Sequence, residues 1–324
     1  MKTFEIQKYT TEHYTKWNEF VAQAKNATFL FHRDFMEYHK DRFDDFSLLI
    51  FDDKGNIKAI LPANRVGDVV YSHQGLTYGG LLLSSKSKLG EVLAVFQSVL
   101  QYLSHQKVKV LEIKQVPAIY CDFPSDEIEY ACFLLEASLR RRDTLSVIDL
   151  QSSFKISSTR KQEIHKTKGL QVKEVFEFET FWNQILMPNL FEKHQAKPVH
   201  TLSEITLLHS KFPKNIRQFN VYFNNQIIAG TTLFVSRNVV HSQYISGSKN
   251  WNQLGGLDFL HHYLITDVFK EKHYFDFGIS NENQGRNINQ GLVFWKESFG
   301  ARTVVQNFYS IQTRNFNLLD SILL

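Results

Sequence analysis

A lysine near the carboxyl end of the chain stands in surroundings that suit chemistry on a carbonyl group. Lys296 lies within the aromatic string 291–301, where helical spacing puts Leu292, Trp295 and Phe299 on one face and the lysine at its edge. A cation beside an apolar wall can stabilise the oxyanion that forms when an amine attacks a thioester or ester, a contribution often worth ~3 kcal/mol. Binding of an acceptor carboxylate and an ordinary surface lysine are the alternatives.

A carboxylate precedes this string in an aromatic stretch. Asp276 lies between Phe275 and Phe277, so alternation along a strand points its side chain away from theirs. A carboxyl in partly apolar surroundings has a raised pKa and could take a proton from an attacking ammonium. Its alternative role is to bond backbone amides in the turn that follows. Lys296 and Asp276 are therefore the candidate catalytic residues.

A pair of glycines comes directly before a helical pattern over 257–269. Glycine lets backbone amides approach a ligand closely, and a helix N-terminus attracts anions. This arrangement suits the pyrophosphate of coenzyme A or a phosphate of RNA, although an ordinary loop-to-helix turn has the same appearance. The residues expected to bind an activated donor are Gly255, Gly256, Gln253, Tyr244 and Ser246.

The acceptor candidates are polar residues at strand ends and at a helix break. A polar loop over 280–291 follows the aromatic strand, at a place where substrate contacts are common. His194 and His200 flank a break at 197–198 and, like His241, are candidate bases, with a structural histidine as the alternative. The acceptor-binding candidates are Glu282, Arg286, Asn287, Asn289, Arg160, His194, His200, His73 and Tyr78, and Arg33 is a further candidate in the first half.

Composition limits the class of protein. The net charge of +4 comes without a continuous basic stripe, so no DNA partner is expected. The densest basic segment is 155–168, and the arginines at 140–142 are expected to end a helix, where they suit its dipole. Two cysteines and no zinc-type spacing predict neither disulfides nor a metal. Without a signal peptide or a long apolar run, we expect a cytoplasmic protein with no membrane span.

Internal self-similarity organises the chain. At an offset of 170 residues (227 − 57 = 170), without a gap, five residues of the first half meet identical residues of the second: Ile57, Ala59, Val69, Val70 and Ser72. The same order of elements continues, with a helical pattern over 89–103 before a strand at 108–113, and one over 257–269 before a strand at 274–277. Chance similarity between apolar strands joined by Asn/Gly turns is the alternative to a true duplication.

The pattern in each half therefore predicts helices, then an antiparallel meander, then a helix and a further strand that is reached by a right-handed crossover. The predicted fold is α/β, with two tandem domains, each a mixed, largely antiparallel sheet flanked by helices. The boundary is expected near 151–153, which divides the chain into 1–150 and 151–324. The predicted helices are 16–24, 181–194 and 202–210, and the predicted strands are 46–51, 57–64, 69–71, 219–223, 227–235 and 239–246.

A strand meander followed by a glycine turn, a helix and a strand resembles the GNAT acyltransferase fold. Two such halves resemble the FemAB-like branch, whose members transfer acyl or aminoacyl groups to amines. The distinctive matches lie mostly after residue 155: a basic helix and strand over 158–172, the strand 274–280, and the string 291–301, in which an aromatic residue and Lys296 come three residues before Phe299 and Gly300. The segment 252–257 matches the glycine turn of coenzyme A users only in part, which leaves the donor open.

The resemblance implies an N-acyltransferase that moves an acyl or aminoacyl group from acyl-CoA or aminoacyl-tRNA to an amine, such as a cell-envelope precursor or an amino sugar. Residues 1–150 are expected to shape the acceptor side without running chemistry, and 151–324 to bind the donor and catalyse. The partners expected are therefore a small-molecule or envelope-precursor amine, with tRNA as a further candidate. The rival hypotheses are a catalytically silent binding module and an RNA-binding protein that uses the segment 155–168.

Overall fold

The computed structural model describes residues 4–165, 167–320 and 322. The chain forms two compact units, one of Met1–Asp143 with Val305–Leu324 and one of Thr144–Val304. Two long strands, β8 (Ser138–Asp149) and β16 (Arg302–Gln312), pass from one unit to the other. The sequence pattern indicated a single boundary near 151, whereas the chain crosses between units twice and residues 305–320 belong to the first unit.

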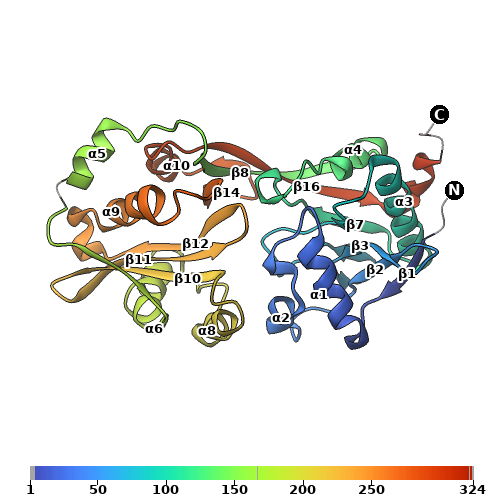
Figure 1. The fold of residues 1–324 in the computed structure, drawn as a ribbon, viewed down its shortest axis with the longest axis horizontal. Coiled ribbons are helices and arrows are strands. Elements are labelled where there is room, and N and C mark those ends of the chain that lie inside the picture. The colour runs from blue at the N-terminus through green and yellow to red at the C-terminus, as the bar shows by residue number, and fades with distance from the viewer. Residues whose placement is uncertain (1–3, 166, 321, 323–324) are drawn as a thin grey trace. The chain divides into compact units, whose positions relative to one another are not determined.

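Unit 1 contains two sheets covered by helices (Figure 1). The first sheet has the order β1 (Glu5–Lys8), β2 (Leu48–Phe51), β3 (Ile57–Leu61) and β6 (Leu82–Leu83). The second has the order β4 (Asn64–Val66), β5 (Val69–Tyr71), β7 (Val110–Lys114) and β16. The helices are α1 (Tyr14–Gln23), α2 (Arg33–Met36), α3 (Leu89–His105) and α4 (Glu127–Leu134), with short 3-10 turns η1 (Thr11–His13), η2 (Phe29–Phe31), η3 (Glu37–His39), η4 (Ala118–Tyr120) and η8 (Thr313–Leu319).

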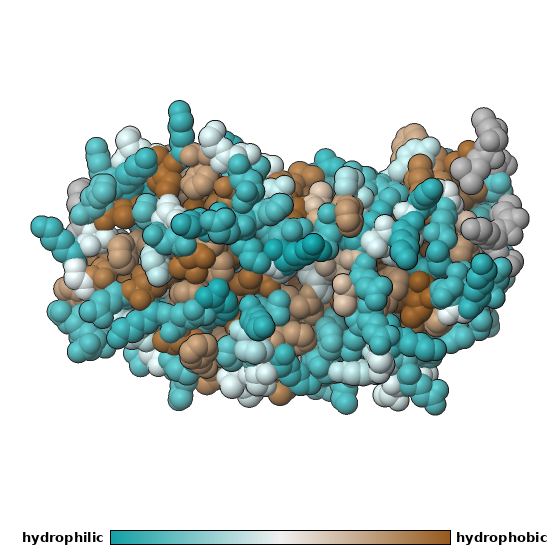
Figure 2. Space-filling view, in the orientation of Figure 1, coloured by the Kyte–Doolittle hydropathy of each residue, from teal (hydrophilic) through white to brown (hydrophobic). Residues whose placement is uncertain are grey.

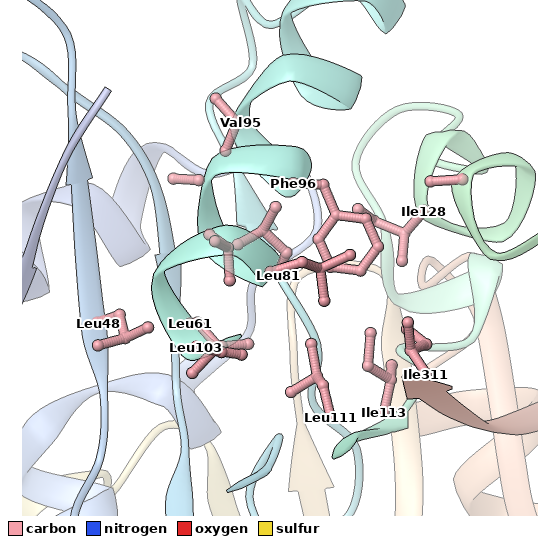
Figure 3. Packing of buried hydrophobic residues seen from close by; sticks show 14 of the residues in the cluster. Leu48, Leu61, Leu81, Val95, Phe96, Leu103, Leu111, Ile113, Ile128 and Ile311 are labelled. Atoms are coloured by element: carbon pink, nitrogen blue, oxygen red, sulfur yellow. The ribbon is translucent and has the colours of Figure 1, made fainter. Parts of the chain in front are cut away.

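Helix α3 supplies the centre of the unit 1 core. Its apolar residues recur every three or four positions, so one face is buried along the whole helix. Figure 3 shows Phe96 of this helix between Ile128 of α4 and Leu81, with Leu111 and Ile113 of β7 below. Ile311 of β16 belongs to the same cluster, which explains why the carboxyl-terminal segment packs with unit 1.

Unit 2 is built around a six-stranded arrangement in the order β8, β13 (Tyr274–Ile279), β12 (Val239–Gly247), β11 (Gln226–Val235), β10 (Ile216–Phe223) and β9 (Gln171–Val175). Its helices are α5 (Ser158–His165), α6 (Glu179–Phe181), α7 (Met187–His194), α8 (Leu202–Lys211), α9 (Gly256–Tyr263) and α10 (Gln290–Glu297). Two π-helical segments are η5 (Trp182–Leu186) and η7 (Leu264–Val268), and a 3-10 segment is η6 (Lys249–Leu254). A small hairpin joins β14 (Asn281–Glu282) to β15 (Asn287–Ile288).

Helices cover both faces of the unit 2 sheet (Figure 1). Helix α9 packs on β10, β11 and β12, and its Leu260 shares a core with Val240 and Phe275. On the opposite face, Trp182 of η5 stacks edge-on against Tyr244 of β12, with ring centroids 5.1 Å apart. Strands β11 and β12 therefore lie between two helical layers, and nearly all residues of β11 are buried.

The two units repeat one arrangement of parallel strands. In unit 1, β5 pairs with β7 through Val69–Val110, Val70–Leu111 and Tyr71–Glu112. In unit 2, β12 pairs with β13 through Val239–Tyr274, Val240–Phe275 and His241–Asp276. The offset of 170 places Tyr71 on His241 (241 − 71 = 170), and an offset of 164 places Glu112 on Asp276 (276 − 112 = 164). The predicted α/β fold with two similar halves is confirmed.

One local prediction was wrong. The arginines at 140–142 do not end a helix, because α4 stops at Leu134 and the chain reverses through Glu136, which has a φ of +54°. They lie in β8, where Arg141 makes two hydrogen bonds to the buried Asp143, of 2.8 and 2.7 Å. Hydrogen bonding along the long strand β8 thus outweighs the favourable interaction of these arginines with a helix dipole, on which the prediction was based.

The surface has ordinary polarity. Figure 2 shows hydrophilic side chains over much of one face, with hydrophobic side chains scattered among them. Within the described part of the chain, no helix combines the length and apolar composition needed to cross a bilayer.

Candidate active site

The centre of the site is a fork between two parallel strands of unit 2. Strands β12 and β13 are paired only over three residues each, and His241 and Asp276 form the last pair. Beyond it β12 continues to Gly247 along β11, while β13 turns at Gly278, which has a φ of +72°. The two strands therefore diverge directly after the histidine and the aspartate.

A histidine–aspartate pair stands at the base of this fork. The Nδ1 atom of His241 lies 2.9 Å from Oδ2 of Asp276, and the other carboxylate oxygen accepts a hydrogen bond of 2.7 Å from the backbone N–H of Gly278. The aspartate side chain is 1% exposed and that of His241 is 14% exposed. A carboxylate that bonds Nδ1–H leaves the lone pair on Nε2, so the imidazole can accept a proton there.

Lys296 holds the end of β13. It lies on α10, is buried, and donates hydrogen bonds of 2.9 and 2.7 Å from Nζ to the carbonyl oxygens of Gly278 and Ile279. Burial lowers the pKa of this lysine to about 8, and the negative charge of Asp276 opposes the shift. Two of its three N–H groups are thus engaged with the strand.

The glycine turn lines a cavity beside α10. Gly255 has a φ of +64° and precedes the first residue of α9, Gly256. Both glycines border a cavity of about 160 Å³ that is also lined by Asn252 and Trp295. A side chain at Gly256 would bring its Cβ within 3.0 Å of Ile228, so the glycine keeps this cavity open. The turn and the residue before Lys296 therefore share one cavity.

Arg160 belongs to a polar network under this cavity. Its guanidinium forms an ion pair with Asp258 in the first turn of α9 and donates a 2.9 Å hydrogen bond to Ser298. The other oxygen of Asp258 accepts a 2.7 Å bond from the indole N–H of Trp295. The arginine predicted to bind an acceptor thus joins α5, α9 and α10, and its charge is balanced within the unit.

The donor candidates on β12 point away from the glycine turn. The hydroxyl of Tyr244 lies 2.7 Å from Nδ1 of His200 and accepts the backbone N–H of that residue, and burial raises the pKa of the tyrosine to about 12. Ser246 accepts a 2.8 Å bond from Asn189. These residues fix α7 and the following loop against the sheet. Gln253 is exposed beside the turn and bonds the carbonyl of Asn250.

The polar loop candidates are exposed at the open end of β13. Asn289 caps α10 by accepting the N–H of Leu292 and donates to Glu282. Asn287 accepts a bond from Asn283, and Arg286 is exposed at the tip. Three of these predicted acceptor residues, Glu282, Arg286 and Asn287, lie in one hairpin, and Asn289 follows it directly. The side chain of His194 lies outside the described part of the structure.

The unit 1 candidates are buried. His73 and Tyr78 are 5% and 3% exposed, and the tyrosine hydroxyl pairs with Thr28 at 3.0 Å. Burial, with the neighbouring His39, lowers the pKa of His73 to about 4. Arg33 is enclosed by Glu37 and Asp45 and packs on the ring of Tyr9. Their burial within unit 1 argues against direct contact with an acceptor.

The sequence pattern singled out Asp276 but not its partner. His241 was one of three candidate bases, and nothing in its local sequence distinguished it from the others. The internal offset was the available signal, because it aligns His241 with the last strand residue before the polar segment of the first half. Only the parallel register shows that the histidine and the aspartate are side by side.

Comparison with known proteins places this site in a known domain. Residues 178–285 match the family model of the acetyltransferase (GNAT) domain, a range that includes the fork and the glycine turn. Unit 2 carries a GNAT acetyltransferase domain. The predicted resemblance to GNAT-type acyltransferases is thereby confirmed, and the protein is an acyltransferase of this type. No curated protein sequence matches the chain.

Solved structures share the fold over nearly the whole chain. The structure of FemX matches with a TM-score of 0.69 at 10% identity, covering 97% of this chain and 99% of FemX. The C-terminal domain of a putative lysylphosphatidylglycerol synthetase from Agrobacterium fabrum matches with a TM-score of 0.56 at 11% identity and 95% coverage of both chains. A tandem GNAT protein from the clavulanic acid pathway matches with a TM-score of 0.51 at 10% identity, over 96% and 99% of the chains. At these identities the likeness establishes the tandem GNAT fold.

Proposed function

We propose that unit 2 transfers an acyl or aminoacyl group from an activated donor to an amine acceptor at the fork of β12 and β13. The observation that carries the proposal is the separation of these strands directly after His241 and Asp276. The cavity at Gly255 and Gly256 is linked to β13 through Trp295, which lines the cavity and whose ring lies 5.5 Å from that of Phe277. Both features lie within or at the edge of the segment that matches the GNAT acetyltransferase domain.

The donor is an acyl-CoA or an aminoacyl-tRNA, since both carry an activated carbonyl and phosphate groups in one molecule. The first turn of α9 offers backbone N–H groups and the positive end of a helix dipole to a phosphate. The segment before it adds charge, because α5 packs on α9 and carries the exposed Lys161, while Lys168 is exposed just beyond. The side chain of Thr167 lies 3.3 Å from the position of a Cβ on Gly255, so this basic segment reaches the turn.

The acceptor is an amine that enters at the open end of β13. The exposed hairpin with Glu282, Arg286, Asn287 and Asn289 supplies a charge of each sign and amide groups for directed hydrogen bonds. An envelope precursor is our first choice of acceptor, because FemX and a putative lysylphosphatidylglycerol synthetase share the fold. An amino sugar is the second.

Lys296 has two roles in this proposal: it holds the backbone of β13 in place, and it supplies a positive charge to the reacting carbonyl. Its bonds to the carbonyls of Gly278 and Ile279 keep β13 turned away from β12, and its remaining N–H can stabilise a developing oxyanion. Because a pKa of about 8 leaves it mostly protonated at neutral pH, the cation is available under ordinary conditions.

The test measures donor binding and turnover separately. The full chain is titrated by calorimetry with acetyl-CoA, longer acyl-CoAs and aminoacyl-tRNAs, and each donor that binds is incubated with envelope precursors and amino sugars while amide formation is followed by mass spectrometry. We expect at least one donor to bind and to transfer its acyl group, with transfer reduced at least tenfold by Lys296→Ala.

The outcome also decides between the rival functions. Binding of a donor with no transfer to any amine would favour a silent binding module. The RNA-binding hypothesis would be favoured if tRNA without an amino acid binds as tightly as aminoacyl-tRNA, if that binding weakens steeply with salt, and if no acyl-CoA binds.

A further inference from the structure

Among the described residues of unit 2, one histidine combines a buried carboxylate partner with partial exposure. His261 is fully buried and donates Nδ1–H to the carbonyl of Leu257. His200 is buried and engaged with Tyr244, and His209 faces the carbonyl of Ile216. His241 alone faces an aspartate that is 1% exposed while keeping 14% of its own side chain exposed.

The carboxylate is itself fixed. Asp276 bonds His241 through one oxygen and the N–H of Gly278 through the other, so its orientation does not depend on the histidine. Gly278 leaves the space that the imidazole occupies, since a Cβ there would lie 3.2 Å from Cε1 of His241. For Nε2 of His241, no hydrogen-bond partner occurs among the residues that the structure describes.

We propose that His241 is the general base of the transfer reaction and that Asp276 is the positioning residue that holds it in the Nδ1–H tautomer. This inference rests on the proposed function and names the group that takes the proton. Asp276, predicted from sequence to take the proton itself, acts through the histidine instead, because both of its oxygens are already bonded.

The step balances without any further reactant. The amine nitrogen attacks the acyl carbon of the thioester or ester, a C–N bond forms, and the ammonium proton of the intermediate passes to Nε2 of His241. The bond from the acyl carbon to the sulfur or oxygen of the donor then breaks. The departing thiolate or alkoxide takes the proton from the imidazolium, which returns the histidine to its starting state.

The experiment compares His241→Gln and Asp276→Asn with the matched control His273→Gln, which removes an exposed histidine just before the same strand. We expect kcat to fall about 100-fold in both test variants, in line with the usual effect of losing a general base. The KM for the amine and the Kd for the donor should change less than threefold, and the control should keep wild-type values.

A cavity-forming variant tests the chemistry independently of folding. In His241→Gly, added imidazole should restore part of kcat in proportion to its concentration, whereas in Asp276→Asn, which retains the histidine, it should not. A merely structural role for the pair would change KM, donor affinity and thermal stability together and would show no rescue.

The two proposals fail in different ways. If His241→Gln binds donor and turns over like wild type, the base assignment is wrong while the acyltransfer function stands. If wild-type protein binds no acyl-CoA and no aminoacyl-tRNA, the proposed function falls first, and the base assignment falls with it.

Discussion

The two units contain the same fork in two different states. In unit 2 the strands β12 and β13 part after His241 and Asp276, and β12 runs on for six residues along β11. In unit 1 the loop 72–80 stays on β7: the N–H of Ser72 donates to the carbonyl of Glu112 at 2.9 Å, and Gly79 forms a parallel bridge to Gln115. The second fork is open, and the first is filled by its own chain.

Individual positions explain the difference. The residue equivalent to Gly278 is Lys114 (278 − 164 = 114), whose Nζ donates to the carbonyl of Leu76 in the filling loop. The residue equivalent to Lys296 is Cys132 (296 − 164 = 132), which is buried in the apolar core. The two units therefore share this arrangement of strands, while His241, Asp276 and Lys296 of unit 2 correspond by these offsets to Tyr71, Glu112 and Cys132 of unit 1.

The largest expected effect comes from filling the donor cavity. Asn252→Trp places an indole where a cavity of about 160 Å³ now lies, and we expect donor affinity to fall about 100-fold, or ~2.7 kcal/mol. Lys88→Trp introduces the same side chain directly before helix α3 of unit 1 and should leave affinity unchanged. Calorimetric titration measures both. Equal losses in the two variants would contradict the idea that only unit 2 binds the donor.

The second-largest expected effect is on stability, when Lys296 of α10 and Cys132 of α4 are each replaced by methionine. Lys296→Met leaves the carbonyls of Gly278 and Ile279 without their donor, so we expect a loss of about 2 kcal/mol in the free energy of unfolding. Cys132→Met places a larger apolar side chain in the core of unit 1, and overpacking of this kind should cost about 1–3 kcal/mol. Urea unfolding of both variants gives the comparison. A neutral Lys296→Met would show that the lysine does not hold β13.

A smaller effect follows from adding one methyl group at the fork. Gly278→Ala strains a residue with a φ of +72° and pushes against His241, so we expect kcat to fall about tenfold with ~1 kcal/mol of lost stability. Gly67→Ala introduces similar strain at a φ of +61° in unit 1, where nothing lies within 4 Å. That control should lose the same stability and keep kcat. A parallel loss of activity in the control would attribute the effect to folding alone.

The smallest effect is a pH dependence of stability. Burial lowers the pKa of Lys296 from 10.5 to about 8, so between these values the unfolded chain binds more protons than the folded protein and stability rises with pH. The contribution is about 1 kcal/mol from pH 8 to pH 9 and disappears in Lys296→Met. Lys114, with a pKa lowered to about 8 in unit 1, should behave in the same direction. Urea midpoints at the two pH values test this, and an unchanged slope in Lys296→Met would rule it out.

Local sequence patterns were sufficient for most of the elements. The predicted helices and strands around 89–103, 227–235, 239–246 and 274–277 correspond to α3, β11, β12 and β13, since periodicity and turn residues act within a few positions. The same patterns missed the strand β16 and misplaced the arginines of β8. Long edge-to-edge pairings between distant segments leave little trace in the residues themselves.

Sequence by itself predicted an α/β protein of two similar halves that resembles GNAT acyltransferases, with Lys296, Asp276 and a glycine turn as its candidate chemistry. Tertiary structure alone decided that His241 meets Asp276, that loop 72–80 fills the first fork, and that the last strand returns to unit 1. The physical reason is that parallel strands joined by a helix pair in a register set by packing across the whole unit. Residues 35 positions apart become neighbours only when that register forms (276 − 241 = 35).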